Sequence, residues 1–268
     1  MATSKSSSAA LKNVLIVIAV ILAMGIAFFM GRATAPQIAA PETDGTNQAG
    51  QQDSAEDTAP NPEAPEERPQ FAESQTDPEL IKRLQEQIKR EEGDPRAIGS
   101  VDAPVVMVSY EDFSCPMCTV FFEQTFPELQ DLIDSGDLRI EFRDLVIFPN
   151  YGSDHAARAS RAAANQGLFW EFVTTAYGQA GAGNHPTYSK ETVLEIAKTV
   201  GVPDMAKFEA DYESDEVKEA VNAETQHGMY NLGITGTPFF IVNNAVVTGA
   251  QPTPYFLKTI EKQLEEAK

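Results

Sequence analysis

The alternation of apolar and polar positions divides the chain into three parts. Val14 to Met30 is almost continuously apolar, residues 32–76 carry very few large apolar side chains, and beyond them apolar residues recur at the spacings of helices and strands. A stretch of roughly 17 to 25 apolar residues is long enough to cross a bilayer as a helix. The pattern therefore predicts a transmembrane segment at residues 13–31, a disordered linker at 32–76 and a folded domain at 77–268.

The apolar segment is either a signal peptide that is cleaved or an anchor that is kept. A possible cleavage site at Ala33-Thr-Ala35 is followed by Pro36, which signal peptidases tolerate poorly, so we favour an uncleaved signal-anchor. Two lysines precede the segment and one arginine closes it, which places residues 1–12 in the cytoplasm and the remainder outside. We expect a single-pass protein of the cell membrane whose C-terminal domain is extracytoplasmic. A buried core helix is the alternative, and the lack of a polar face argues against it.

The linker at residues 32–76 is rich in Pro, Ala, Gln, Thr and acidic side chains, as in the run from Pro62 to Glu67. Such a composition buries too little apolar surface to offset its conformational entropy, so we predict a disordered, acidic spacer. A tether that spans a cell wall and a plain linker both fit this composition.

The folded domain begins at Asp77-Pro78, because Asp is a good N-cap and Pro suits the first turn of a helix. Val105 to Tyr110 is a short, apolar, β-branched run typical of a buried strand. The helix that follows contains Pro127, which should kink it. Leu138 to Arg143 then alternates apolar and charged residues, which predicts a strand with one solvated face.

From about residue 150 to 232 the periodicity is helical, which predicts a small α-helical domain inserted between strands. Phe239 to Val242 and Ala245 to Val247 predict a hairpin that turns at Asn243-Asn244, and Thr253-Pro254 opens a final helix. The order strand, helix, strand, helical block, hairpin and helix predicts an α/β fold.

Both cysteines of the chain form one Cys-x-x-Cys pair, Cys115 and Cys118, between a strand-like run and an aromatic run at helical spacing. In the first turn of a helix, unpaired N–H groups and the helix dipole lower a cysteine pKa from about 8.5 to roughly 3.5–7.5. Cys115 is expected in that place, and Cys118 is near enough to close a small disulfide ring with it. Pro116 and Met117 between them supply no cation. A thiolate in such a pair is the nucleophile of thiol–disulfide exchange.

Zinc is the rival interpretation of this pair. One Cys-x-x-Cys supplies two of the four ligands of a structural zinc, and a site shared by two chains needs long heptad arms that this sequence lacks. His155, His185 and His227 lie far from the cysteines and from each other in sequence, so we predict surface or local packing roles for them. We expect no metal, and no cofactor other than the redox-active disulfide.

The net charge of the chain limits the classes of molecule that it can bind. The 268 residues include 20 Lys plus Arg against 40 Asp plus Glu, a net charge of −20, which argues against nucleic acid. Two cysteines with only two residues between them provide no structural disulfide framework. Phe169, Trp170 and Phe172 lie at helical spacing and are predicted to belong to the core rather than to a substrate groove.

The element order and several separated motifs resemble the DsbA-like thiol–disulfide oxidoreductases, which have a thioredoxin-like fold with an inserted α-helical domain. The resemblance covers the chain from Gly99 onward and rests on Ala103-Pro104-Val105, Asp112 to Cys118, Gly233 to Val242, and Gly249-Ala250. It implies that Cys115 is the exposed, attacking cysteine and Cys118 the resolving one. It also implies that Thr237-Pro238 is a cis-proline pair that faces them and binds an extended substrate through its backbone.

One position departs from the pattern. Many thioredoxin-fold enzymes carry a buried carboxylate six residues before the first cysteine, where this chain has Ser109. Glu111, on the same strand face, and Asp112 are the candidate proton-relay groups in its place. The alternative for each of the two residues is a solvated acid in a loop, with no part in proton transfer. A proton path through water is the remaining alternative.

The resulting hypothesis is an extracytoplasmic, membrane-tethered thiol–disulfide oxidoreductase that introduces disulfides into unfolded or reduced secreted proteins. It implies a membrane redox partner that resets the pair, and a monomer. A disulfide reductase or isomerase is one alternative, although isomerases of this fold usually have a dimerisation domain. A non-redox, chaperone-like domain that binds peptides at Pro238 is the other.

Overall fold

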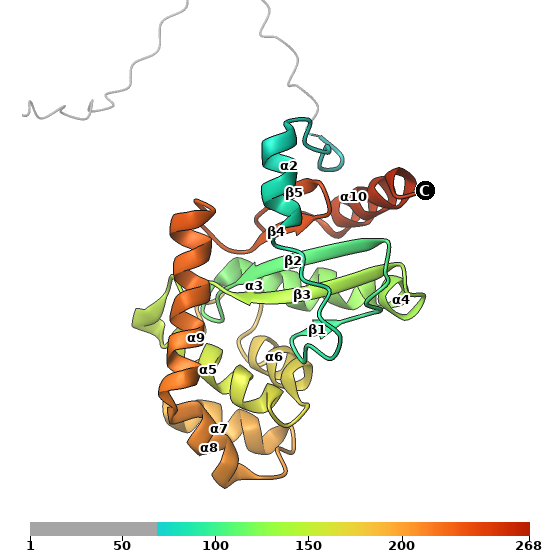
Figure 1. The fold of residues 1–268 in the computed structure, drawn as a ribbon. Helices are drawn as coiled ribbons and strands as arrows, with labels where there is room; N and C mark the ends of the chain where they lie inside the picture. Colours follow the sequence, from blue (N-terminus) through green and yellow to red (C-terminus); the bar gives the residue numbers. More distant parts are fainter. Residues whose placement is uncertain (1–68) are drawn as a thin grey trace, which may run out of the picture. The chain divides into compact units, whose positions relative to one another are not determined.

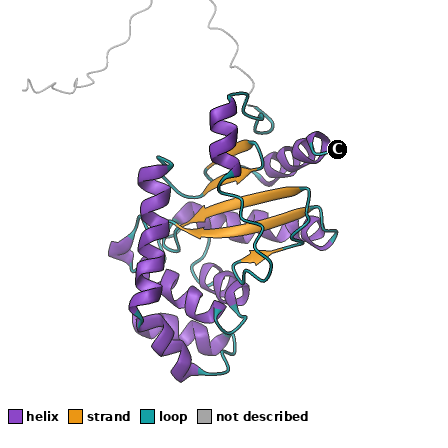
Figure 2. Cartoon of the chain, viewed as in Figure 1, coloured by secondary structure: helices purple, strands orange, loops and turns teal. Residues whose placement is uncertain are grey.

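The computed structural model describes residues 69–268 (Figures 1 and 2). The predicted cytoplasmic N-terminus at residues 1–12, the transmembrane segment at 13–31 and most of the linker at 32–76 lie outside the described residues. Within residues 69–268, no helix is both long and apolar enough to span a membrane.

The regular elements follow one another in the predicted order, except that a short strand at Ala97–Ile98, which the sequence pattern did not predict, precedes the other strands. They are α2 (Pro78–Gln85), β1 (Ala97–Ile98), β2 (Val105–Glu111), α3 (Pro116–Val120), η1 (Phe121–Thr125), η2 (Phe126–Leu129), α4 (Gln130–Asp134), β3 (Leu138–Asp144), η3 (Pro149–Tyr151), α5 (Ser153–Ala164), α6 (Phe169–Gly178), α7 (Lys190–Thr199), α8 (Met205–Glu213), α9 (Asp215–Gln226), η4 (His227–Asn231), β4 (Phe239–Val242), β5 (Ala245–Thr248) and α10 (Thr253–Glu266).

A five-stranded sheet in the order β1-β3-β2-β4-β5 forms the centre of the described structure. Strands β2 and β3 are parallel, and β4 runs antiparallel to β2 and to β5. Alternate residues of β2 enter two cores because successive side chains of a strand point to opposite faces. Val105 and Met107 join the large core beneath α3 and α10, whereas Val106 and Val108 join a smaller core closed by α2. Ser109 and Glu111 therefore share the face of the cysteine helix.

The first described helix starts as predicted, whereas the domain starts earlier. Asp77 caps α2 by accepting hydrogen bonds from the Glu79 and Leu80 N–H groups. Upstream of it, Ala72 is buried and donates its N–H to Thr259 Oγ1 at 2.9 Å, and Ser74 bridges to Ala245 of β5. The predicted boundary at residue 77 is therefore too late, because a short polar segment can pack through backbone hydrogen bonds that composition does not reveal.

The helix that carries the cysteines is interrupted where Pro127 predicts a kink. After α3 the backbone passes through a π turn, η1, and a 3-10 turn, η2, that contains Pro127. Proline cannot donate the N–H that would continue the α-helical ladder. The aromatic residues Phe121 and Phe122 of the π turn are buried against the sheet, which fixes the start of the cysteine helix.

The expectation of a solvated face on β3 is wrong. Every residue of β3 is buried, and the charged side chains on the face of Glu141 pair with one another, since Glu141 contacts Arg139 Nε at 3.2 Å and Arg143 NH2 at 2.7 Å. The N–H groups of Lys89 and Arg90 donate to the same carboxylate at 3.0 and 2.8 Å. The chain between α2 and β1 therefore covers this face, and ion pairing makes its charged residues compatible with burial.

The helical insertion (residues 149–231) lies between β3 and β4, in line with the expected range of about 150–232 (Figure 1). Phe169 and Phe172 are buried, and Trp170 stacks on Phe126 with a centroid distance of 5.5 Å, so all three serve the core. Helix α9, late in the insertion, returns to the end of β3. Glu224 of α9 accepts the Asp144 N–H at 2.7 Å, and Thr225 Oγ1 accepts the Val146 N–H at 3.1 Å.

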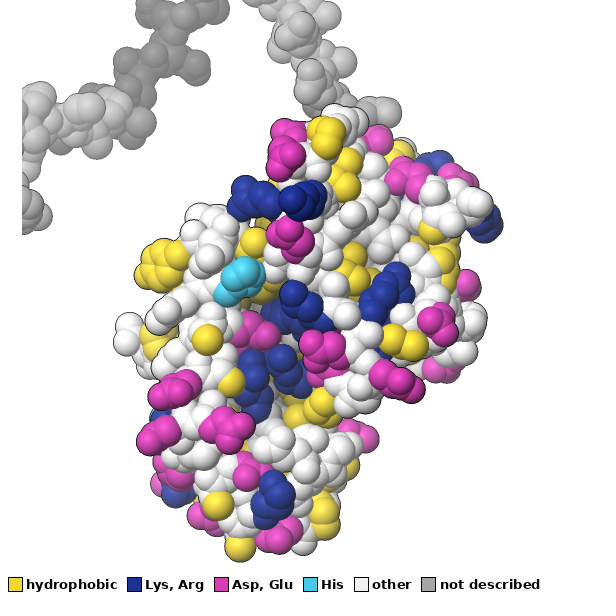
Figure 3. All heavy atoms as spheres, viewed as in Figure 1, with side chains coloured by type: hydrophobic (Ala, Val, Ile, Leu, Met, Phe, Trp, Pro, Cys, Tyr) yellow, Lys and Arg dark blue, Asp and Glu magenta, His cyan; other side chains and the backbone are white. Residues whose placement is uncertain are grey.

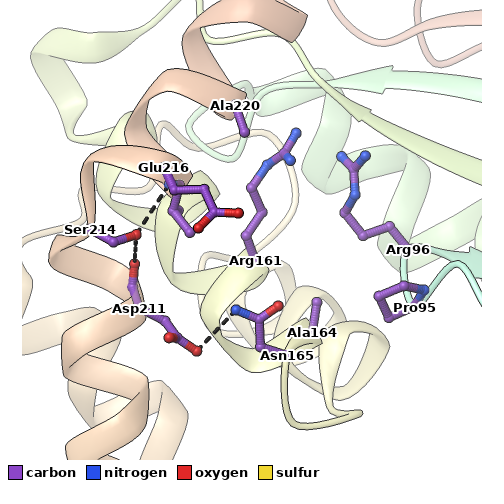
Figure 4. Close-up of a pocket in the computed structure, with 10 residues that line it drawn as sticks. Pro95, Arg96, Arg161, Ala164, Asn165, Asp211, Ser214, Glu216 and Ala220 are labelled. Atoms are coloured by element: carbon purple, nitrogen blue, oxygen red, sulfur yellow. Dashed lines mark hydrogen bonds between the residues drawn. The ribbon is translucent and has the colours of Figure 1, made fainter.

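Lys and Arg side chains gather in a hollow between the sheet and the insertion (Figure 3). Two pockets of about 250 and about 390 Å³ open there, and both are lined by Arg161. In the smaller one, Arg96 and Arg161 extend from different segments toward the same region (Figure 4). Both guanidinium groups bind Glu224 at 2.8 and 2.7 Å. These pockets therefore contain a structural charge network, and neither is lined by residues of the cysteine helix.

Candidate active site

The cysteine pair lies at the N-terminus of α3. Cys115 is the N-cap residue, Pro116 follows it in the first turn, and Cys118 is inside the helix. Both cysteines are free thiols. Cys115 is 3% exposed, so the expectation of an exposed sulfur is wrong, and Met117, at 43%, is the exposed residue of the motif. Cys118 is completely buried.

The loop before β4 covers the Cys115 sulfur. The Thr237-Pro238 peptide bond is cis, in agreement with the sequence-based expectation. The Thr237 carbonyl oxygen lies 3.2 Å from Cys115 Sγ and accepts a hydrogen bond from the thiol. Because β4 pairs with β2, this loop and the cysteine helix lie at the same end of the sheet. The two sequence motifs, 122 residues apart, therefore meet.

The two thiols have opposite acidities. The pKa of Cys115 is lowered to about 6, chiefly because the Cys118 thiol hydrogen-bonds to its sulfur. Burial opposes this, and the Thr237 side chain and the N–H groups of Cys118 and Met117 add to the lowering. Burial raises the pKa of Cys118 well above its ordinary value, and the neighbouring Cys115 and Glu111 raise it further. One sulfur of the pair therefore ionises near neutral pH and the other stays protonated.

Glu111 is buried next to the resolving thiol. Glu111 is the last residue of strand β2 and is 1% exposed. Its side chain accepts a hydrogen bond from the Ser109 hydroxyl and lies within hydrogen-bonding reach of Cys118. Its second oxygen, Oε2, has no hydrogen-bond partner within the described residues. Burial raises the pKa of Glu111 to about 8, against the lowering effect of the Cys118 and Ser109 hydrogen bonds. The carboxyl group therefore holds a proton at neutral pH.

Asp112, the other candidate acid, has a different environment. Its carboxylate accepts hydrogen bonds from the N–H groups of Ser114 at 2.6 Å, Ile147 at 2.7 Å and Phe148 at 2.9 Å. These bonds tie the loop before Cys115 to the segment that follows β3. Asp112 thus has the contacts of a structural acid. Neither it nor Glu111 is a solvated loop acid, because both are 1% exposed.

Sequence reasoning missed His185. Its Nδ1 lies 2.8 Å from the carbonyl oxygen of Ser114, the residue before Cys115. No sequence signal indicates this contact, because 71 residues separate the two positions. His155, which contacts Tyr212, and His227, 2.8 Å from Gln87 Oε1, do have the local packing roles expected for all three. Within residues 69–268, no three His, Cys, Asp or Glu side chains are placed to hold a metal ion.

A dithiol with one acidic and one protonated sulfur, beside a proton-holding carboxyl group in a thioredoxin-like sheet, defines a thiol–disulfide oxidoreductase site. The comparisons with known proteins agree with this class. Residues 91–262 match the family model described as thioredoxin. Disulfide bond formation protein D of Bacillus subtilis is 31% identical over 180 residues, covering 63% of this chain and 76% of that protein.

Solved structures have the same fold. The crystal structure of oxidised BdbD from Bacillus subtilis superposes with a TM-score of 0.58 at 25% identity, covering 73% of this chain and 98% of that one. Alpha-DsbA1 from Wolbachia pipientis superposes with a TM-score of 0.56 at 21% identity, covering 64% and 92%. The chain belongs to the thioredoxin family, and within it to the DsbA-like thiol–disulfide oxidoreductases, the enzymes of disulfide bond formation.

Proposed function

We propose that this oxidoreductase introduces disulfides into unfolded or reduced secreted proteins, with Cys115 as the sulfur that exchanges with substrate and Cys118 as the resolving sulfur. The observation that carries this assignment is the difference between the two thiols, since the pKa of Cys115 is about 6 and that of Cys118 is raised. A stable Cys115 thiolate stabilises the reduced enzyme, so the disulfide is passed on readily.

The reaction is written from the oxidised pair. A substrate thiolate attacks Cys115 Sγ, a substrate–Cys115 disulfide forms, the Cys115–Cys118 bond breaks, and Cys118 leaves with the electron pair. A second substrate thiolate then attacks the substrate sulfur and expels Cys115 as a thiolate. The substrate loses two electrons and two protons. One proton restores the acid that has protonated Cys118, and the other goes to solvent. A membrane redox partner that accepts two electrons restores the disulfide.

Glu111 is the proposed proton donor for this step. Cys118 leaves as a thiolate in a buried site, where burial raises its pKa, and it must be protonated there. Glu111 is within reach and protonated at neutral pH, because burial raises its pKa to about 8. Asp112 is assigned the structural role of holding the loop, on the basis of its three backbone hydrogen bonds. This division gives different roles to the two candidate acids that the sequence leaves open, of which Glu111 is the favoured one.

Thr237 and Pro238 form the proposed substrate-binding edge. Their position over Cys115 supports recognition of an extended peptide by backbone hydrogen bonds, with little dependence on its sequence. Pro116 and Met117 complete the surface around the sulfur, and the exposed Met117 side chain provides an adaptable apolar contact.

The compartment follows from the same chemistry. Disulfides persist outside the cytoplasm, so we place the domain on the extracytoplasmic side of the cell membrane. Residues 13–31 are the proposed signal-anchor, residues 1–12 its cytoplasmic flank, and the segment between anchor and domain a disordered acidic linker. The partners are secreted proteins and a membrane redox partner, with no nucleic acid, and the proposed state is a monomer.

Thiol labelling tests the cysteine assignment. In the reduced, full-length protein, Cys115 should react with iodoacetamide with a half-maximal rate near pH 6, and Cys118 should remain unlabelled at pH 7, as followed by mass spectrometry. Cys118→Ser should accumulate mixed disulfides with a reduced, unfolded protein, and Cys115→Ser should form none. Equal and slow labelling of both thiols at pH 7 would show that the assignment is wrong. Peptide binding at native affinity without any exchange would favour the chaperone-like alternative.

A further inference from the structure

His185 is a titratable side chain near the cysteines that the proposed reaction does not use. It belongs to the insertion loop (residues 179–189), which connects α6 to α7. Its Nδ1 lies 2.8 Å from the Ser114 carbonyl oxygen, and a carbonyl can only accept, so Nδ1 carries the hydrogen. The ring is therefore held one peptide unit from Cys115.

Several contacts fix the ring in this place. It stacks on Tyr151 with a centroid distance of 4.5 Å and an interplanar angle of 14°, and Phe148 meets it edge-on at 4.8 Å. Within the insertion loop, the Gly183 N–H donates to Thr119 Oγ1 of the cysteine helix at 3.0 Å. Past the histidine, the Tyr188 N–H donates to the Tyr151 carbonyl at 2.8 Å. The insertion loop is thus attached on both sides of His185.

Acceptor and aromatic groups contact the ring within the described residues. The loop before Cys115 contributes the Ser114 carbonyl oxygen, η3 contributes the Tyr151 ring, and the segment before η3 contributes the Phe148 ring. None of these groups is a competing cation. An aromatic ring stacked on an imidazolium adds a favourable interaction.

We propose that His185 is a positioning residue of the dithiol site, whose imidazolium supplies from the insertion loop the positive charge that Pro116-Met117 lacks, and so stabilises the Cys115 thiolate. The proposal deepens the proposed oxidase function and rests on it. A cation close to the thiolate stabilises the reduced enzyme, which makes the disulfide a stronger oxidant. The insertion thereby contributes to the redox chemistry of the sheet domain as well as to its packing.

The decisive variants separate charge from hydrogen bonding. His185→Gln keeps a donor and removes the charge, and His185→Lys restores a charge. The Cys115 pKa is measured in the full-length protein by thiolate absorbance against pH, and the reduction potential by equilibration with glutathione. His185→Gln should raise the Cys115 pKa by about one unit, slow alkylation at pH 6 by about fivefold and lower the potential by about 30 mV. His185→Lys should recover much of each change.

His155→Gln is the matched control. His155 also packs against a tyrosine, Tyr212, and contacts Arg158, but makes no contact with the cysteine helix. It should leave the Cys115 pKa unchanged. An unchanged pKa and potential in His185→Gln would overturn the proposal and leave the oxidase assignment intact. A wild-type Cys115 that does not ionise below pH 8 would instead refute the assignment of Cys115 itself.

Discussion

Glu111 and Glu141 are two buried glutamates on neighbouring strands of one sheet, and they have opposite electrostatic environments. Glu111 ends β2 on the face of the cysteine helix, and Glu141 lies on the other face, in register with Val108. Their exposures are 1% and 0%. Burial alone would favour the protonated acid in both places.

The difference lies in the donors. Burial raises the pKa of Glu141, but the N–H groups of Lys89 and Arg90 and the guanidinium groups of Arg143 and Arg139 outweigh it, so its pKa is lowered. Glu111 receives only the Ser109 hydroxyl and the Cys118 thiol, and its pKa rises to about 8. The comparison shows that the donors around a buried acid decide its protonation state. With several strong donors the acid stays ionised and is a fixed charge, as in Glu141, and with few donors it keeps a proton that it can give up and is a proton store, as in Glu111.

The largest expected effect tests the fixed charge. Glu141→Gln leaves the Arg139 guanidinium without its counter-charge and leaves Arg143 with only the more distant Glu224, at 3.9 Å, so the free energy of unfolding should fall by about 3–5 kcal/mol in urea titrations at pH 7. Because the folded pKa of Glu141 is lowered, its contribution is present above the unfolded pKa and is lost as the pH falls through the folded value. The loss in the variant should therefore shrink in acid.

Glu195→Gln is the control for this measurement, because Glu195 forms an exposed ion pair with Lys198. Its effect should stay within about 0.5 kcal/mol. A similarly small effect for Glu141→Gln would show that Glu141 is not a fixed charge on which stability depends, and would contradict the comparison with Glu111. Labelling of Cys115 should be unaffected in both variants.

Glu111→Gln tests the proton store and should act in the opposite direction. A folded pKa of about 8 means that Glu111 carries no penalty below its unfolded pKa and costs stability as the pH rises toward 8. The variant should therefore match the wild type near pH 4 and gain roughly 2–4 kcal/mol at pH 8. Its rate of disulfide transfer at pH 7 should fall by about 10- to 100-fold, because the amide cannot protonate Cys118.

Stopped-flow kinetics with a reduced peptide measures that rate, and urea titrations at several pH values measure the stability. A native transfer rate in Glu111→Gln would assign the proton transfer to water and leave Glu111 a buried acid without a role. A loss of stability at pH 8 would show that the carboxyl group is ionised in the folded protein, as in Glu141.

Ser109→Ala should have the smallest effect. The Ser109 hydroxyl donates to Glu111 and lowers its pKa, so its removal should raise that pKa by less than about one unit and move the upper limb of the pH–rate profile to higher pH. Stability should change by less than about 1.5 kcal/mol. An unchanged profile would mean that the serine packs beside the carboxyl group without tuning it.

The fold and the cysteine pair could be predicted from sequence because their signals are local. The Asp77 cap, the Pro127 interruption and the turn at Asn243-Asn244 each depend on a few adjacent residues. The alternation of charged residues at Arg139, Glu141 and Arg143 led to the wrong prediction of a solvated face on β3. The same alternation occurs on a solvated face and on a buried face whose charges are ion-paired, so the sequence pattern does not distinguish them.

Only part of the candidate active site could be predicted from the sequence. Glu111 and Asp112 are adjacent acids, and only the direction of each side chain separates a thiol neighbour from three backbone donors. The burial of Cys115 depends on a loop 122 residues away, and the contact of His185 on a loop 71 residues away. Tertiary packing decides these features, and no short-range pattern encodes them.

The meeting of α9 with the end of β3 also bears on how such a protein can diversify. The insertion leaves the sheet just past Asp144 and returns beside it at Glu224, 80 residues later. For the sheet, the insertion is a loop whose two ends lie side by side. Lengthening such a loop adds little to the entropic cost of closing it. Evolution can therefore enlarge, trim or exchange the helices of the insertion without shifting the register of a single strand.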